Sequence, residues 1–166
     1  MIDYAKAYTE LHERKADMFA GRSIVPHVDA IAQLVEKTGA QTLLDFGSGK
    51  GHQYSEDNVH LRWGGIMPTL YDPGIPELAK CPKRRFDGVI CTDVMEHIAP
   101  DDVKLVLLDV FRHSRLFVFF SIACRPAKKF FPDGTNVHLT VKGHNWWERK
   151  INNAAKGRRY QIAFVD

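Results

Sequence analysis

The stretch Leu43-Leu44-Asp45-Phe46-Gly47-Ser48-Gly49-Lys50-Gly51 joins an apolar segment to three glycines at every second position. Its apolar part, residues 42–46, has the composition of a buried strand. Glycine allows a tight turn after a strand, and it lets the backbone approach a ligand without a Cβ in the way. The stretch therefore predicts a strand that runs directly into a ligand-binding loop.

Strand and helix patterns alternate along the rest of the chain. Further strands are predicted at residues 66–71, 86–91, 116–123 and 160–165. Helices are predicted at residues 4–18, 23–39, 100–114 and 145–155. Several strands are apolar on both faces, which is typical of a parallel sheet with helices on both sides. The sequence therefore predicts an α/β fold: a three-layer, Rossmann-like, mostly parallel sheet of about five or six strands, with N-terminal helices.

The length and composition favour a single domain. The chain has 166 residues, of which 45% are hydrophobic and 26% charged, as in ordinary globular proteins. We expect one domain over residues 1–166, with a helical cover at residues 1–40 and the core at residues 41–166. The first helix is expected to fold over the ligand crevice as a lid, with Tyr4 and Tyr8 facing an acceptor.

Cysteine usage and hydropathy bear on location. The cysteines, Cys81, Cys91 and Cys124, are odd in number and form no C-x-x-C pair, which favours a reducing compartment and argues against structural zinc. The start of the chain has no basic stretch followed by an apolar run, so no signal peptide is expected. No segment approaches the ~20 apolar residues that span a bilayer. We therefore predict a cytoplasmic protein without a membrane partner.

The formal net charge is +3, which is weaker than in most dedicated nucleic-acid-binding domains. The positive residues lie in short clusters, at residues 83–85, 125–129 and 156–159. Two interpretations remain open. The clusters are either solvated loops or part of a binding surface for an anionic acceptor.

The spacing of the glycines and two acidic residues indicate the ligand. In the dinucleotide fingerprint G-x-G-x-x-G the third glycine comes one residue later than here. Asp45 would repel a diphosphate, but it suits a cationic group such as the α-ammonium of an amino acid. Asp72 ends the next predicted strand, where an acid in nucleotide-binding domains accepts hydrogen bonds from ribose hydroxyls. Such a ligand, with an amino acid at one end and a nucleoside at the other, is S-adenosylmethionine (SAM).

Three motifs in order carry a family resemblance. They are D-x-G-x-G-x-G from Asp45, the acid Asp72, and Phe-Asp-Gly-Val-Ile-Cys-Thr-Asp-Val-Met-Glu-His-Ile at residues 86–98. They resemble the first, second and fourth motifs of class I SAM-dependent methyltransferases, and the last is similar to the FDxVxxxxVLEH form of the general methyltransferase branch. The resemblance runs from about residue 42 to residue 123.

The resemblance implies a set of cofactor contacts. The glycine loop would surround the methionyl part of SAM, and of the product S-adenosylhomocysteine. Asp45 would support that loop or the ammonium, Asp72 would bind the ribose, and Asp93 with its neighbour would close the pocket. The chain departs from the family at residues 75–85, which leave little room for the usual third strand and its adenine contact. The implied cofactor residues are Asp45, Gly47, Ser48, Gly49, Gly51, Asp72, Asp93 and Val94.

Methyl transfer from SAM is a displacement at carbon, so a hydroxyl or protonated amine acceptor also needs a base within reach. Candidates for this base are Glu96 and His97, after the predicted strand at residues 86–91, and His138, in the long polar connection at residues 124–143. The Asp/Asn-Pro-Pro-Tyr/Phe tetrad of amino-methylating DNA enzymes is missing, which disfavours a DNA base as acceptor. No paired acidic motif indicates a magnesium-dependent enzyme, so no metal is predicted.

Three functions remain open at this level. The first is methylation of an oxygen or nitrogen atom on a small molecule or glycan. The second is an RNA or protein methyltransferase that uses the basic clusters. The third is a SAM-binding module without catalysis. The glycine spacing disfavours a nicotinamide-dependent dehydrogenase, and nothing in the sequence predicts an oligomeric state.

Overall fold

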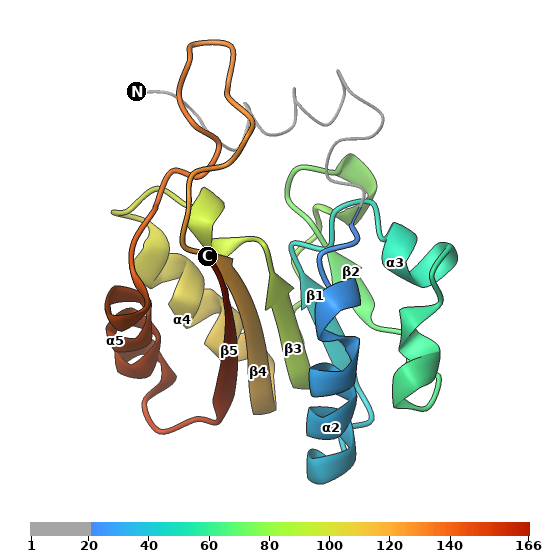
Figure 1. Ribbon diagram of the computed structural model, residues 1–166. Coiled ribbons are helices and arrows are strands. Elements are labelled where there is room, and N and C mark those ends of the chain that lie inside the picture. The colour runs from blue at the N-terminus through green and yellow to red at the C-terminus, as the bar shows by residue number, and fades with distance from the viewer. Residues whose placement is uncertain (1–20) are drawn as a thin grey trace.

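A computed structural model of the chain describes residues 21–166 and shows an α/β fold (Figure 1). The strands are β1 (Leu43–Phe46), β2 (Thr69–Tyr71), β3 (Phe86–Thr92), β4 (Ser114–Ala123) and β5 (Tyr160–Val165). The α-helices are α2 (Val28–Thr38), α3 (His52–Ser55), α4 (Val103–His113) and α5 (His144–Ala155). Single 3₁₀ turns are η1 (Val25–His27), η2 (Val59–Trp63), η3 (Pro76–Leu78) and η4 (Met95–His97). The predicted first helix, and with it Tyr4 and Tyr8, lies outside the described residues.

The five strands form one all-parallel sheet in the order β2-β1-β3-β4-β5. The prediction of a parallel α/β sheet is thus confirmed. All carboxyl ends of the strands lie along one edge, since every pair is parallel. The chain moves from β1 outward to β2 and then returns to place β3 on the other side of β1. Such a reversal of strand order leaves room for a ligand at the carboxyl ends of the two central strands.

Helices cover both faces of the sheet (Figure 1). One face packs against α2 and η2, and the other packs against α4 and α5. Helix α2 buries Ile31, Leu34 and Val35, whose spacing places them on one side of the helix. It ends at Gly39, which has a left-handed φ of 66°. No helix in the described part of the chain has the length and apolar character needed to cross a membrane.

Four elements begin two or more residues from their predicted starts. Two of them are α2, which begins at Val28 after the 3₁₀ turn η1, and β4, which begins at Ser114. The strand predicted at residues 66–71 begins only at Thr69. Pro68 precedes it and has no N–H to donate to a neighbouring strand. The helix predicted at residues 100–114 begins at Val103, because Pro100 and the two residues after it form a turn in which the Val103 N–H bonds Ala99 O at 3.2 Å.

The connection from residue 124 to residue 143 rises beyond the carboxyl ends of the strands (Figure 1). Its later part is tied to the segment after β3. Thr140 N–H donates to Glu96 O at 2.9 Å, and its hydroxyl donates to Ile98 O at 2.6 Å. Phe131 and Val137 bury their side chains. These contacts place the connection beside the edge of the sheet where a ligand is expected.

Candidate functional site

The glycine loop after β1 requires glycine for its conformation. Gly47, Gly49 and Gly51 have φ angles of 80°, 56° and 71°, in the left-handed region that other residues rarely adopt. A Cβ on Gly47 would lie only 2.3 Å from Cγ2 of Val94, which follows β3. The loops after β1 and β3 therefore meet where the strand order reverses, and two residues predicted at the site lie side by side.

Asp72, at the end of β2, holds this loop in place. Its Oδ2 accepts the Gly49 N–H at 2.8 Å, and its Oδ1 accepts the Gly74 N–H at 2.9 Å. The residue is 9% exposed. Gly47 and Ser48 also donate their N–H groups to Tyr71 O, at 2.7 and 3.2 Å. The Asp72 carboxylate, which the family resemblance assigns to ribose binding, thus also sets the geometry of the glycine loop. Each of its two oxygens has a second lone pair that could accept a hydrogen bond from a ligand.

Asp45 is a buried carboxylate with one unpartnered oxygen. It is 1% exposed, and its Oδ2 accepts hydrogen bonds from Gln53 Nε2 and Tyr54 OH, both at 2.9 Å. Oδ1 has no hydrogen-bond partner among the described residues. The pKa of Asp45 is raised to about 7, mainly by burial. The hydrogen bond from Tyr54 lowers this pKa, and the charge of Asp72 raises it. A cationic ligand group at Oδ1 would offset this burial.

The raised pKa of Asp45 predicts a specific dependence of stability on pH. The folded protein keeps a proton that the unfolded chain, with a carboxyl pKa of 3.8, releases. Without ligand, the free energy of unfolding should therefore fall as the pH rises from about 4 to about 7, and then level off. Asp45→Asn removes the titrating group. The melting temperature of the variant minus that of the original protein should therefore be larger at about pH 8 than at about pH 5.

Thermal unfolding of both proteins across this pH range measures the effect. Asp101→Asn makes the same change at an exposed position before α4 and should leave the pH dependence as it was. A difference between the Asp45→Asn protein and the original that stays constant with pH would contradict the assignment of this titration to Asp45.

Glu96, one of the candidate bases, is completely buried. Its Oε1 accepts the N–H of Ala123, the last residue of β4, at 2.5 Å. Burial raises the pKa of Glu96 well above its usual value, and the charge of Asp93 raises it further. This carboxyl group therefore joins the segment after β3 to the end of β4, and its Oε2, like Oδ1 of Asp45, is buried without a hydrogen-bond partner among the described residues.

The other two candidate bases lie together. The rings of His97 and His138 have centroids 4.8 Å apart and are nearly perpendicular, at 85°. His97 Nδ1 lies 2.9 Å from Val137 O, and His138 Nδ1 lies 2.7 Å from Arg125 O. Burial lowers the pKa of His97 to about 4, while the charge of Asp93 acts in the opposite direction. His97 is therefore a neutral imidazole at neutral pH.

Sequence reasoning missed several residues of this edge. Gln53 and Tyr54, which bind Asp45, follow the glycine loop directly, so their place at the start of the next helix was the available signal. Nothing local indicated Ser23, whose hydroxyl lies 2.8 Å from Thr92 Oγ1 at the end of β3. Gly21 O accepts the Gln53 N–H at 2.9 Å. The segment before α2 therefore contacts both β3 and the helix after the glycine loop.

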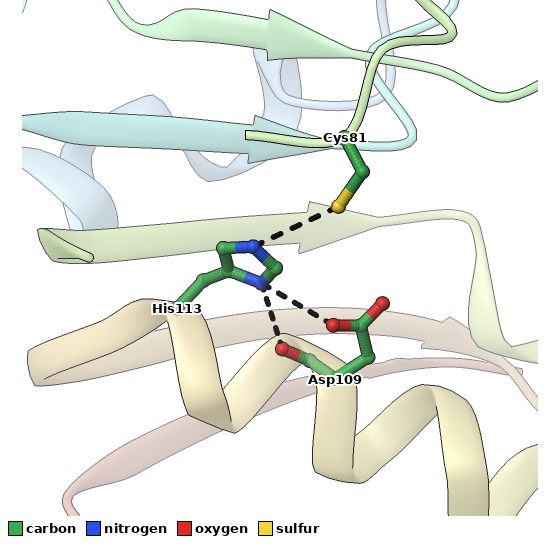
Figure 2. A group of neighbouring side chains, drawn as sticks. All are labelled: Cys81, Asp109 and His113. Atoms are coloured by element: carbon green, nitrogen blue, oxygen red, sulfur yellow. Dashed lines mark hydrogen bonds and ion pairs between the residues drawn. The ribbon is translucent and has the colours of Figure 1, made fainter. Parts of the chain in front are cut away.

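A second group of titratable side chains joins α4 to the segment after β2 (Figure 2). Cys81 Sγ is 3.7 Å from His113 Nε2, and His113 Nδ1 is 3.5 Å from Asp109 Oδ1. The His113 ring lies 6.4 Å from the ring of Phe46, the last residue of β1, so the group packs between α4 and the sheet. An open groove of about 510 Å³ beside it is lined by residues 81–85, Arg112 and His113. None of these residues belongs to the predicted cofactor site.

No protein-family model matches the chain, and a search of curated proteins finds no match. A function can therefore be inferred only from the geometry at the carboxyl edge of the sheet. That edge combines a glycine loop, a buried acid with an unpartnered oxygen, and a neutral imidazole. Such a set can bind a small ligand with a cationic group and can accept a proton from a second substrate.

Proposed function

We propose that the protein binds SAM across the carboxyl ends of β1, β2 and β3 and transfers its methyl group to an acceptor. The observation that carries the proposal is the unpartnered, buried Oδ1 of Asp45 beside the glycine loop. The α-ammonium of the methionyl group would supply both the N–H donor and the positive charge that this oxygen lacks. The three motifs shared with class I methyltransferases support the same ligand.

The acceptor side of the site is provided by His97 and His138. The sulfonium of SAM already activates the methyl group, so the protein has to align the acceptor with it and remove a proton. The neutral imidazole of His97 can accept this proton from a hydroxyl or an amine. The products are S-adenosylhomocysteine and the methylated acceptor. We infer that the acceptor atom is an oxygen or nitrogen of a small molecule or glycan.

Methylation of RNA is the second candidate, because one basic cluster lies at the same edge. Arg125, Lys128 and Lys129 belong to the connection that carries His138, and Arg125 O contacts its ring. The charge of Lys129 also acts on His97, where it lowers the pKa. An anionic acceptor would bind here with a steep dependence on salt, whereas binding of a neutral glycan would change little with salt.

The test is calorimetric titration of the protein with SAM, S-adenosylhomocysteine and 5′-methylthioadenosine, which lacks the amino acid. We expect all three to bind and the first two to bind more tightly. Asp45→Asn should weaken the first two by about tenfold or more, which corresponds to about 1.4 kcal/mol, and should leave methylthioadenosine unchanged. Failure of SAM and S-adenosylhomocysteine to bind would overturn the proposal. Binding without transfer to any acceptor of a panel would favour the module without catalysis.

A further inference from the structure

Two histidines and an aspartate converge beside the glycine loop, next to Val94, which contacts Gly47. Asp93 follows β3, His97 belongs to the turn η4, and His138 belongs to the connection before α5. One possible metal-ligand atom from each lies within 4.8 Å of the other two. Two segments that are distant in sequence, the one after β3 and the connection before α5, thus bring together a carboxylate and two imidazoles. This is a donor set that binds divalent transition-metal ions in proteins.

Backbone carbonyl groups orient both imidazoles in the way that metal binding requires. His97 Nδ1 lies 2.9 Å from Val137 O, and His138 Nδ1 lies 2.7 Å from Arg125 O. A carbonyl oxygen can only accept a hydrogen bond, so Nδ1 carries the hydrogen in each ring. In the neutral form of each ring the lone pair is then on Nε2, the nitrogen that would bind the metal. Metal-binding histidines are generally held by such a hydrogen bond from the other ring nitrogen.

The backbone of Asp93 also indicates a constrained position. Its φ of 58° lies in the left-handed region, which is uncommon for residues other than glycine. The Asp93 N–H donates to Ser121 O at 3.0 Å, which anchors the residue to the end of β4. The residue itself is exposed. Backbone strain of this kind is often found at functional sites, where the surrounding structure maintains it.

Two other groups of possible metal ligands occur in the described part of the chain, and neither has this arrangement. In the group of Cys81, Asp109 and His113, the Nδ1 of His113 lies 2.8 Å from the carbonyl oxygen of Asp109 (Figure 2). Its Nε2 lies 2.8 Å from the carbonyl oxygen of Pro82. Neither nitrogen is then directed toward a metal.

The third group contains Cys124, His144 and Asp166. The imidazole ring of His144 stacks on the ring of Phe164, with the two centroids 4.2 Å apart. His144 Nε2 is already 2.8 Å from Asp166 Oδ1, and both residues are exposed. Of the three groups, the one formed by Asp93, His97 and His138 is therefore the best suited to bind a metal ion.

We propose that Asp93, His97 and His138 bind a divalent transition-metal ion such as Zn²⁺. Three protein ligands leave at least one coordination position open, as in catalytic zinc sites. If the proposed function holds, an acceptor hydroxyl would bind at this position and lose its proton to solvent more easily, since a bound metal lowers the pKa of a coordinated oxygen group. His97 would then be a metal ligand, and it would act as the base only in the metal-free protein. Metal binding itself depends on the three side chains and does not depend on that function.

The test titrates the full-length, metal-free protein with Zn²⁺ by calorimetry and with Co²⁺ by visible absorption. We expect about one equivalent of each to bind, with absorption bands that indicate nitrogen and oxygen ligands. His138→Ala should weaken binding by about tenfold or more. Asp93→Asn removes the carboxylate but keeps a residue that tolerates a left-handed backbone, and it should have a similar effect. The control His144→Ala removes the histidine of the third group and should leave the affinity unchanged.

Absence of Zn²⁺ binding would overturn the proposal. Zn²⁺ affinity that is unchanged in Asp93→Asn and His138→Ala proteins with the original melting temperature would also overturn it. Loss of Zn²⁺ binding in the His144→Ala protein would overturn it as well. SAM titrations with and without EDTA separate this result from the proposed function. Zn²⁺ binding in a protein that does not bind SAM would support the metal site and overturn the proposed methyltransferase function. SAM binding without Zn²⁺ binding would support that function and overturn the metal site.

Discussion

Asp72→Asn is expected to weaken SAM binding by about 100-fold. The carboxylate accepts the N–H groups of Gly49 and Gly74, and hydrogen bonds to a charged group contribute about 1.5–3 kcal/mol each. An asparagine would turn an NH₂ group toward one of these two donors. The glycine loop would then lose a contact that sets its left-handed conformation, and the ribose would lose a charged acceptor.

Calorimetry with SAM measures this loss, and a thermal melt of the variant separates it from unfolding. Asp29→Asn is the matched control, because its carboxylate is exposed on α2 and contacts only Arg62 among the side chains that the structure describes. An Asp72→Asn protein that melts normally and binds SAM as tightly as the original would show that Asp72 does not serve the cofactor.

Trp147→Ala is expected to lower the free energy of unfolding by about 3–5 kcal/mol. Trp147 is fully buried in α5 and belongs to the same hydrophobic cluster as Ile151, Phe120 and Val118. Removing its ring would leave a cavity between the helix and the sheet. Since a whole domain is stabilised by only about 5–15 kcal/mol, this variant would be close to unfolding.

Trp146→Ala is the control for this substitution. Trp146 is the adjacent residue, with its ring centroid 4.8 Å from that of Trp147, but it is only half-buried and its ring faces Lys150 at 5.1 Å. Its loss should cost about 1 kcal/mol, mainly from packing and the cation–π contact. Urea denaturation of the two variants measures both values. Equal losses would contradict the placement of Trp147 in the core and Trp146 at its boundary.

The hydrophobic pattern was sufficient to predict the five strands and the helices α2, α4 and α5. The strand at residues 160–165 was predicted with the bounds that the structure shows, and the end of α2 was predicted at Gly39. Both depend on neighbouring residues, namely a short apolar run and a glycine that can adopt a left-handed φ. The start of α4 was predicted three residues early, because Pro100 fits either a first helical position or the turn before it.

The candidate site was predictable only in part. The motif from Asp45 to Gly51 is continuous, so the sequence indicated a ligand loop after β1. The role of Asp72 in holding the glycine loop was not accessible in this way, because its contact to Gly49 depends on how β2 lies against β1. His138 was a separate candidate, and nothing local indicated that its ring would contact His97.

By itself, the sequence determined a parallel α/β sheet, a glycine loop after its first strand and an acid ending the second. These features follow from local polarity and from the backbone freedom of single residues, which act over a few neighbours. The tertiary structure alone decided the strand order, the burial of Glu96 and the meeting of Asp93, His97 and His138. The meeting of these three side chains depends on the connection at residues 124–143 returning to the segment after β3, and a long-range contact of this kind leaves no periodic trace in a single sequence.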